Sequence, residues 1–353
     1  MTLASPPVAH IAVIGAGIAG LACAQALTDA GLAVTLFDKA RGPGGRMSSR
    51  HRPDAVVDLG AQAFTARDPA FIAALDTWRH AGCAAGWPDS AWRAGPGGWQ
   101  RIHDGRERFC GAPRMSAITR YLADQVEQAG AALHPATRIR AIDGAPGALR
   151  LQSEQGDIFG PYTQVVIAVP PPQAEPLVQP WDNVLGERCR HLAQRACWAG
   201  WAIFDAPLPT PQGVDANWQQ AHAEHPALRL VSRNQRKPGR DRQPESVTLL
   251  AHSDWSEAHL EDAPAQVADV LLDALATLFS GQPLPALVEH GAHRWRYSQP
   301  ADGGAFRPEN GFIIGAAGLA LCGDSLRGGR VEDAWLSGHR LGQRLGQGLT
   351  GCD

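Results

Sequence analysis

Lysine is scarce in this chain: of its 32 lysine and arginine residues, only Lys39 and Lys237 are lysines. Chemistry that needs a lysine amine therefore has two candidate residues. Long apolar runs are missing as well, since no stretch approaches the ~18 residues of a membrane span. A formal net charge of -3 argues against a nucleic-acid-binding surface. We therefore expect a soluble, cytoplasmic protein that binds neither nucleic acid nor membranes.

Paired cysteines are missing too. The seven cysteines are scattered, without a C-x-x-C pair or the spacing of a metal site. We therefore expect reduced thiols and no bound metal. No basic segment precedes the first apolar stretch, so we expect no signal peptide. A length of 353 residues with 44% hydrophobic residues suits a globular protein of two domains.

A glycine-rich turn lies near the N-terminus. Gly15, Gly17 and Gly20 follow an apolar segment and open a helical pattern, and Asp38 ends the next apolar segment. The first glycine permits a tight turn, the second lets backbone approach a pyrophosphate, and the third lets helix and strand pack closely. Asp38 can accept hydrogen bonds from ribose hydroxyls. The pattern predicts a βαβ unit that binds a dinucleotide at the helix N-terminus.

Two further segments suit a nucleotide. Gly44, Gly45 and Arg46 follow Asp38 closely, and the bare amides with the guanidinium can approach and neutralise a pyrophosphate. Farther along, Gly60 allows backbone close to a ring system, and Gln62 could hydrogen-bond that ring. The alternatives are a solvated basic loop for the first segment and a plain strand turn for the second.

The C-terminal region contains a second motif that is expected to bind the dinucleotide. Gly323 and Asp324 follow an apolar segment, and a helix is expected from about Val331, after Gly329 and Arg330. We expect Asp324 to meet a ribitol chain. The helix N-terminus is expected to face flavin N1 and the C2 carbonyl, where it would stabilise anionic reduced flavin. This second motif predicts FAD, although acidic residues after Val331 also suit any helix start.

The remaining pattern predicts a discontinuous α/β architecture. Strands are expected over 8–14, 33–37, 137–142, 164–169, 198–204, 247–252 and 320–322, and helices over 18–30, 115–129, 263–278 and 331–345. The prolines at 170–172 are expected to end regular structure. We expect a Rossmann-like FAD-binding domain over 1–64, 112–172 and 291–353. An α+β substrate domain is expected to be inserted over 65–111 and 173–290.

The chain resembles the bacterial renalases, a branch of the FAD-dependent amine-oxidase superfamily. The resemblance covers nearly the whole chain and rests on VIGAGIAGLACAQAL, RGPGGRMSS, DLGAQAFTARD, PRMSAITRYL, RNQRKP, AHRWRYSQP and CGDSLRGGRVEDAWLSG. The glycine and Gly-Asp motifs are shared by the superfamily, and the other segments are more specific to the branch. The resemblance implies an amine-oxidase/p-hydroxybenzoate-hydroxylase-like architecture.

The resemblance also implies an activity. Renalases oxidise dihydro isomers of NAD(P) that are reduced at ring position 2 or 6; hydride passes to flavin N5, and O2 reoxidises the flavin to give H2O2. It extends the expected cofactor contacts to this set: Gly15, Ala16, Gly17, Ile18, Ala19, Gly20, Asp38, Lys39, Gly45, Arg46, Met47, Gly60, Ala61, Gln62, Arg138, Ile139, Gly323, Asp324, Gly329, Arg330 and Val331.

Typical amine oxidases use a lysine near the flavin and an aromatic cage. Here Lys39 belongs to the ribose-side loop and Lys237 to a basic loop, so neither is expected to be that lysine. Of the three tyrosines, we expect Tyr297 to reach the flavin. The segment after Tyr297 has no cysteine that could attach flavin, which predicts non-covalent FAD. Trp295 or Trp335 could still rebuild part of a cage.

The substrate contacts are expected from the second insertion and the segment after it. Five basic residues lie within 233–242, and either this run is a solvated hairpin tip or it meets a nucleotide together with Asn234. His252 and Arg294, with Trp295 and Tyr297, complete the candidate catalytic set. A core histidine and simple packing are the alternatives for His252 and Trp295.

Other functions remain open at this point. An amine oxidase or desaturase of the same fold would need a deep apolar pocket. An FAD-bound protein that acts by binding a partner would need an exposed apolar surface. For that surface, the tryptophans within 65–111 are the candidates, although tryptophans are more often part of a core.

Overall fold

A computed structural model describes residues 9–240, 244–301 and 307–350 of the chain. The chain forms two compact units. Unit 1 comprises Met1–Gly45, Thr119–Gln194 and Pro300–Asp353, and unit 2 comprises Arg46–Ile118 and Arg195–Gln299. Across the described residues, no helix combines the length and apolar character that a membrane span requires.

Unit 1 is built on a six-stranded sheet of order β19-β20-β13-β1-β2-β9. All neighbouring strands are parallel except β19 and β20. The strands are β1 (His10–Ile14), β2 (Ala33–Phe37), β9 (Ala132–His134), β13 (Gln164–Ile167), β19 (Phe312–Ile314) and β20 (Leu319–Cys322). β1, β13 and β20 are almost wholly buried, as expected for central parallel strands whose sequences do not alternate.

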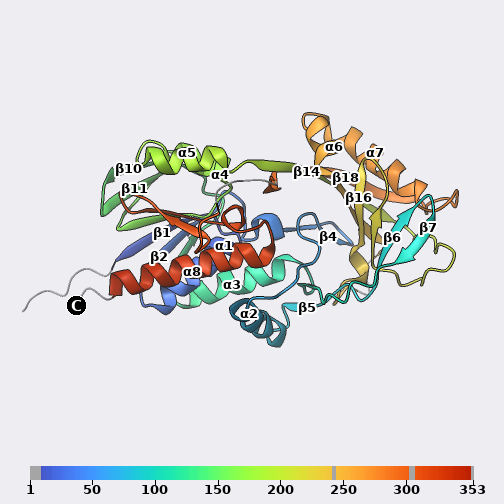
Figure 1. The fold of residues 1–353 in the computed structure, drawn as a ribbon, viewed down its shortest axis with the longest axis horizontal. Coiled ribbons are helices and arrows are strands. Elements are labelled where there is room, and N and C mark those ends of the chain that lie inside the picture. The colour runs from blue at the N-terminus through green and yellow to red at the C-terminus, as the bar shows by residue number, and fades with distance from the viewer. Residues whose placement is uncertain (1–8, 241–243, 302–306, 351–353) are drawn as a thin grey trace, which may run out of the picture. The chain divides into compact units, whose positions relative to one another are not determined.

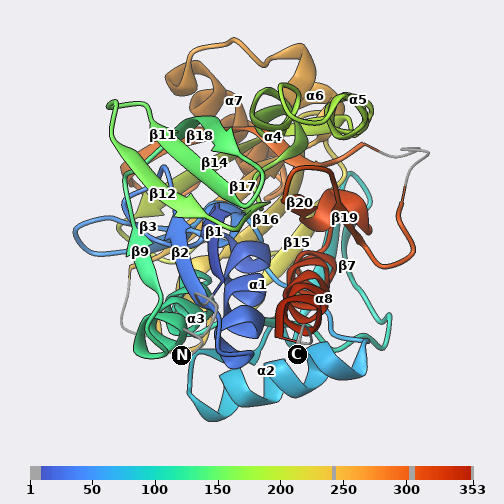
Figure 2. The ribbon, with the colours of Figure 1, turned by 90° about the vertical axis from the view of Figure 1, so that its left-hand side faces the viewer.

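Two helices cover this sheet together. α1 (Ile18–Asp29) and α8 (Val331–Thr350) lie side by side, as Figure 1 and Figure 2 show. The two helices are in close contact at Gly338, where a Cβ would lie 1.8 Å from the Ala19 carbonyl oxygen. The N-terminal and C-terminal segments of the chain therefore share one core.

The rest of unit 1 is a three-stranded antiparallel sheet with three helices. The sheet comprises β10 (Ile139–Ala145), β11 (Ala148–Ser153) and β12 (Ile158–Tyr162), and the helices are α3 (Ser116–Gln128), α4 (Pro171–Val178) and α5 (Asn183–His191). The predicted strand 137–142 thus lies outside the parallel sheet. The expected end of regular structure at 170–172 is wrong. α4 begins at Pro171, because a proline at the first helical position lacks only an N–H that would be unpaired there.

Unit 2 is built on a seven-stranded sheet of order β18-β14-β17-β16-β15-β6-β7. The strands are β6 (Ala91–Gly95), β7 (Gly98–Arg101), β14 (Gln194–Phe204), β15 (Gln220–Ala223), β16 (Leu228–Arg233), β17 (Ser246–Ala251) and β18 (Leu287–Pro300). Two small sheets pair β3 (Ser49–His51) with β4 (Val56–Asp58) and β5 (Ala84–Gly86) with β8 (Phe109–Gly111). The helices are α2 (Pro69–His80), α6 (Ser253–Ala258) and α7 (Pro264–Thr277).

The two faces of the large sheet have different neighbours. α7 packs on one face of the sheet (Figure 1). On that face Leu271 belongs to a core that includes Trp198 and other large apolar side chains. The other face packs against β4 and the segment after it, where Leu59 meets Trp201 and Leu250. This second face carries the residues that matter for function below.

The predicted domain ranges differ from the two units in four segments. Residues 46–64, 112–118 and 291–299 lie in unit 2, and 173–194 lies in unit 1. The last segment forms α4 and α5, whose apolar side chains join the core of β10, β13 and β20. The first contains β4, whose apolar residues pack on the large sheet of unit 2. Packing partners distant in sequence set these boundaries.

Candidate functional site

The glycine turn after β1 has room for a ligand beside it. Gly15 has a φ of +108°, and a Cβ there would lie 2.9 Å from the Ala168 carbonyl oxygen. A Cβ on Gly20 would lie 1.9 Å from the Gly15 oxygen, so both positions require glycine. By contrast, a Cβ on Gly17 would meet nothing within 4 Å. Gly17 precedes α1 and adds no side-chain cap, which leaves the amides of the first turn for an anion.

Asp38 follows β2 and lies beside the glycine turn; we call the turn, the first turn of α1 and Asp38 the cradle. One carboxylate oxygen accepts a hydrogen bond from the Ala16 amide at 2.7 Å, and the other accepts one from the Ala40 amide at 2.7 Å. Burial raises the pKa of Asp38, and these two amides oppose that rise. A carboxylate has about four acceptor positions, so two positions are left for the hydroxyls of a ribose.

The neighbouring predicted contacts have mixed surroundings. The Lys39 amine donates to Gln173 Oε1 at 3.2 Å and is exposed. Arg138 is exposed and pairs with Glu154 at 3.3 Å. The Ile139 side chain belongs to the hydrophobic core, so any cofactor contact there is through backbone. These three positions flank the cradle less directly than Asp38 does.

The C-terminal motif reaches the same edge of the sheet. β1 pairs in parallel with β13, and β13 pairs in parallel with β20, so the turns after β1 and β20 both leave the carboxyl edge. Gly323 follows β20 with a φ of +149°, and its amide donates to Ser337 Oγ at 2.8 Å. The parallel sheet thus aligns two motifs that lie some three hundred residues apart in the sequence.

The turn into α8 is held by its own side chains. Gly329 has a φ of +86°, and a Cβ there would lie 2.9 Å from Pro300 Cδ. The Arg330 guanidinium pairs with Asp333 at 2.9 Å, and Asp333 also accepts from the Arg330 amide at 3.1 Å. Asp333 therefore has the cap role that a helix start favours. The N-terminus of α8, at Val331, remains a candidate for a flavin contact.

The segment 58–62 is braced within unit 2. A Cβ on Gly60 would lie 1.9 Å from the Arg46 carbonyl oxygen, which accepts from the Ala61 amide at 3.0 Å. The Gln62 amide group donates to the Asp58 and Gly60 carbonyls at 2.6 and 3.0 Å. Gln62 therefore helps to fix this turn, and its predicted contact with the ring stays a prediction.

Arg46 and Met47 also have partners of their own. An Arg46 Nη donates to the Ser298 carbonyl oxygen at 3.0 Å, and the Met47 side chain is buried. In unit 1, the Gly44 amide donates to the Ala16 carbonyl oxygen at 3.0 Å, so that glycine segment folds back onto the first turn. The predicted phosphate contact of Arg46 stays a prediction.

Residues 233–240 of the basic run are largely internal, which excludes the solvated hairpin tip, one of the two alternatives for this run. Lys237 and Arg240 are fully buried, and each donates to Asp58 Oδ2 at 2.8 Å. Lys237 also donates to Gln62 Oε1 at 3.2 Å. We call Asp58, Lys237 and Arg240 the Asp58 cluster. Arg242 lies outside the described residues.

Other members of the run are engaged in the same way. Arg233 pairs with Glu245 through two hydrogen bonds, and both side chains are buried. Asn234 is also buried; its carbonyl oxygen accepts from the Asp58 amide at 3.2 Å, and its amide donates to Thr248 at 3.0 Å. These contacts let Asn234 position β4, and the predicted substrate contact of Asn234 stays a prediction.

The other candidate catalytic residues do not share one surface. Trp295 lies on the β4 side of the sheet, where its indole donates to the Leu59 carbonyl oxygen at 2.8 Å. Arg294 lies on the α7 side, over the Trp198 ring, and pairs with Glu261 at 2.9 Å. Neighbouring residues of a strand face opposite sides, so Arg294 and Trp295 cannot line the same face of the sheet.

His252 and Tyr297 are partly buried. His252 precedes α6, its amide donates to the Ala227 carbonyl oxygen at 2.9 Å, and its own carbonyl accepts from Ser256. Burial lowers the pKa of His225, and the charge of the His252 ring lowers it further. Neither placement excludes a substrate contact, and both roles stay predictions.

A basic group on the β4 side of the sheet has no local signature in the sequence. Arg93 pairs in register with His222, His222 with Leu230, and Leu230 with Leu250. Paired residues point to the same face, and Leu250 belongs to the core on the β4 side. β6 and β15 are parallel and more than a hundred residues apart, so no local pattern could reveal this pairing.

Arg229 belongs to the same group, because the register of β16 shifts between Leu228 and Leu230 and Arg229 therefore departs from the simple alternation of the strand. Burial raises the pKa of the Cys197 thiol, and the nearby Arg229 guanidinium lowers it. Burial lowers the pKa of His222, and three guanidinium groups lower it further, those of Arg229, Arg108 and Arg93. We call these four residues the Arg229 cluster.

The arginines of this cluster differ in whether a carboxylate lies near them. Arg93 lies 3.7 Å from Glu224, and Arg108 pairs with Asp104. Within the described parts of the chain, Arg229 has no carboxylate within 4.0 Å. The cluster can therefore accept an anion. The same residues include no group of three or more His, Cys, Asp or Glu side chains placed to hold a metal ion.

Comparison with known proteins relates the chain to two families. The NAD(P)-binding Rossmann-like domain matches residues 13–78, and the flavin containing amine oxidoreductase family matches residues 81–345, more than half of the chain. A hydroxyneurosporene desaturase of Rubrivivax gelatinosus is 47% identical over 76 residues, 20% of this chain. The bifunctional tRNA-modifying protein MnmC of Magnetococcus marinus is 44% identical over 70 residues, also 20% of this chain. These matches span 14% and 10% of the two relatives.

Solved structures share the fold over nearly the whole chain. A protein described as a protoporphyrinogen oxidase from Exiguobacterium sp. 255-15 has a TM-score of 0.77 at 12% identity, covering 98% of this chain and 100% of that chain. A putrescine oxidase variant has a TM-score of 0.68 at 12% identity, with the same coverage. The predicted α/β fold class, with a Rossmann-like dinucleotide-binding part, is confirmed.

Proposed function

The chain belongs to the flavin containing amine oxidoreductase family and is an FAD-dependent oxidoreductase, and on this premise we propose that it is a renalase-like oxidase of misreduced NAD(P). Its substrates would be the 2- and 6-dihydro isomers. The balanced reaction is dihydro-NAD(P) plus O2 and a proton, giving NAD(P)+ and H2O2. Bound FAD supplies the hydride acceptor and passes the electrons on to O2.

The structure's cradle fits such a cofactor. The open space at Gly17 and the first turn of α1 suit a pyrophosphate, and the two vacant acceptor positions of Asp38 suit a ribose. Gly323 and the start of α8 lie at the same carboxyl edge of the sheet. We propose that these residues hold FAD without a covalent bond.

The Arg229 cluster is the observation that carries the substrate assignment. A dinucleotide has a diphosphate, and Arg229 is a partly buried guanidinium on the sheet face with no carboxylate partner among the described residues. A guanidinium can hold a phosphate through two parallel hydrogen bonds. A protonated amine would be repelled by the same charge, so the cluster favours an anionic nucleotide over an amine.

The positions of the two lysines support the same choice. Lys237 is fully buried and bonded to Asp58 and Gln62, and Lys39 is exposed in unit 1 and bonded to Gln173. Neither is left to act as the flavin-proximal lysine of an amine oxidase. Hydride can leave a dihydropyridine without loss of a proton from nitrogen. The proposed reaction therefore needs positioning and charge stabilisation more than a general base.

Arg229→Gln tests this assignment. The variant would lose a charged hydrogen bond worth about 1.5–3 kcal/mol, so KM for misreduced dinucleotides should rise by about 10-fold or more while kcat changes less. The matched substrate is the corresponding dihydronicotinamide riboside, which has no phosphate and should be oxidised equally well by both proteins. Arg79→Gln, at an exposed arginine of α2, is the control variant.

Two results would contradict the assignment. One is an equal loss with the riboside, which would place Arg229 in the machinery for the ring rather than for the phosphate. The other is an unchanged KM for the dinucleotides. If amines rather than dihydropyridines reduce the flavin, the activity is that of an amine oxidase, which the family membership alone would also allow.

A further inference from the structure

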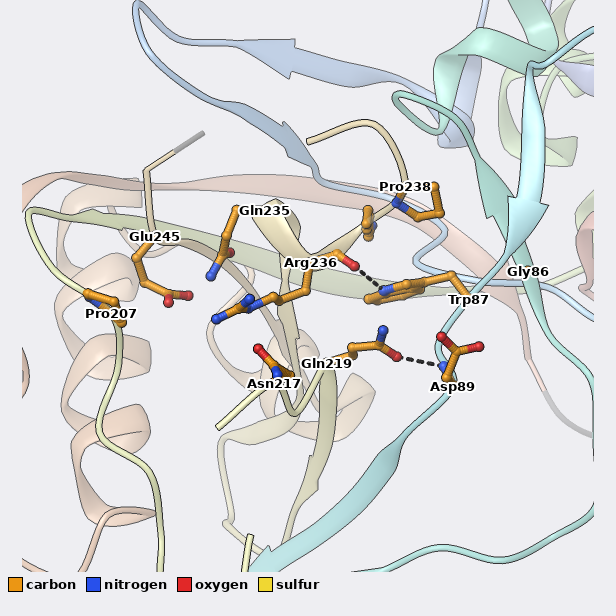
Figure 3. A pocket seen from close by; sticks show the side chains of 11 residues that line it. Gly86, Trp87, Asp89, Pro207, Asn217, Gln219, Gln235, Arg236, Pro238 and Glu245 are labelled. Atoms are coloured by element: carbon orange, nitrogen blue, oxygen red, sulfur yellow. Dashed lines mark hydrogen bonds between the residues drawn. The ribbon is translucent and has the colours of Figure 1, made fainter. Parts of the chain in front are cut away.

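Unit 2 contains a pocket whose lining residues have no role in the proposed function. Its volume is about 480 Å³, within the range of roughly 300–1,000 Å³ that small-molecule sites have. Its lining includes Trp87, Asn217, Gln219, Gln235 and Arg236 (Figure 3). These residues come from the segment after β5, the segment before β15 and the turn after β16.

Arg236 is the unusual member of this lining. It is partly exposed, and its Nε is buried without a hydrogen-bond partner. Among the described residues, no carboxylate lies within 4.0 Å of its guanidinium. The nearby Glu245 is engaged twice by Arg233. Burial lowers the pKa of Arg236 and the charge of Arg233 lowers it further, while the charges of Glu245 and Asp215 raise it.

The position of Arg236 is nevertheless fixed. Its carbonyl oxygen accepts a hydrogen bond from the Trp87 indole at 3.0 Å, which Figure 3 draws as a dashed line. In the same view the Arg236 side chain extends away from Trp87, toward Glu245, with Gln235 and Asn217 to either side. Buried polar groups in native proteins are nearly always hydrogen-bonded, and a charged group without a partner is costly. A held but unpartnered guanidinium at a pocket therefore indicates an external partner.

Amide side chains add hydrogen-bond donors to the same pocket. The Gln219 carbonyl oxygen accepts from the backbone amides of Asp89 and Ser90 at 2.6 and 3.1 Å, so its NH2 group is left as a donor. The Gln235 carbonyl oxygen accepts from the Ser246 amide at 3.3 Å, which leaves its NH2 group as a donor too. One cation with several N–H donors is the complement of an oxyanion.

We propose that this pocket binds the phosphate or carboxylate group of a small molecule, with Arg236 as its main partner. The site differs from the Arg229 cluster in its residues, and its occupancy does not depend on the oxidase reaction. The inference goes beyond the proposed function and survives if that function is wrong.

Ligand binding to the purified FAD-loaded protein tests the proposal. The probes are inorganic phosphate, AMP and citrate, and the readouts are calorimetric titration and the shift in unfolding temperature that a bound ligand causes. Arg236→Gln should weaken binding by about 10-fold or more, because a charged hydrogen bond is lost. Its unfolding temperature without ligand should be unchanged, because the guanidinium has no partner to lose.

One control variant separates this site from surface arginines. Arg79→Gln should bind the probes as the unchanged protein does. Tighter binding of AMP and phosphate would identify a phosphate ligand, and tighter binding of citrate a carboxylate ligand. Equal binding by Arg236→Gln, or no binding of any probe at millimolar concentration, would overturn the proposal.

Discussion

Replacing Asp58 by asparagine removes the only carboxylate of the Asp58 cluster. Lys237 and Arg240 are fully buried and would be left without a counter-charge. Burial alone raises the pKa of Asp58, but the two cations outweigh burial and lower that pKa from 3.8 to about 2. This fall corresponds to about 2 kcal/mol in favour of the ionised carboxylate. Removing one partner of a buried ion pair costs about 3–5 kcal/mol, so we expect Asp58→Asn to lower the free energy of unfolding by about 3 kcal/mol or more.

Urea unfolding, followed by tryptophan fluorescence and circular dichroism, measures this loss. The matched control is Asp54→Asn, which removes an exposed carboxylate from the same hairpin and should change stability by no more than about 0.5 kcal/mol. Lys237→Met is a sharper comparison, because it leaves Asp58 and Arg240 as a balanced pair. It should cost less than Asp58→Asn. Equal costs for Asp58→Asn and Asp54→Asn, or a larger cost for Lys237→Met, would refute the charge-balance reasoning.

Four further predictions follow from the same structure. Gly17→Ala should leave the unfolding temperature of the apoprotein unchanged but weaken FAD retention, measured by flavin release on dilution, because a Cβ there meets only open space. Gly20→Ala should instead lower the apoprotein unfolding temperature, because its Cβ would overlap the Gly15 carbonyl oxygen. The folded-state pKa of Asp58 is depressed, so its stabilising effect is present above pH 4 and is lost as pH falls toward 2. The cost of Asp58→Asn, measured by urea unfolding at several pH values, should shrink over that interval. Trp295→Phe should cost about 1 kcal/mol of unfolding free energy, since one indole hydrogen bond is lost; an unchanged urea midpoint would contradict this.

The sequence predicted the nucleotide-binding core well because its signals are local. The turn at Gly15, the helix after Gly17 and the strand that ends before Asp38 all lie where the glycine spacing and apolar segments place them. α8 begins at Val331 as expected, since acidic residues and a preceding glycine mark its start. Such elements depend on neighbours within a few residues, and their pattern is visible without the fold.

The substrate side was predicted less well because its contacts are distant in the sequence. A basic run resembles a solvated surface segment as long as its partners are unknown. Lys237 pairs with Asp58, which lies 179 positions away in the sequence. The group around Arg229 and His222 forms only when β6 pairs with β15, and these two strands come from different insertions. Arg294 and Trp295 are sequence neighbours but face opposite sides of β18. No local pattern distinguishes a buried ion pair from a surface charge.

The most direct test of the central claim is anaerobic mixing of the yellow FAD-loaded protein with candidate reductants. We predict that 2- and 6-dihydro-NAD(P) bleach the flavin rapidly, that ordinary NADH and a panel of amines do not, and that H2O2 appears when air is admitted. Bleaching by amines alone would contradict the account and make the protein an amine oxidase. Absence of bleaching by the misreduced isomers would contradict it equally.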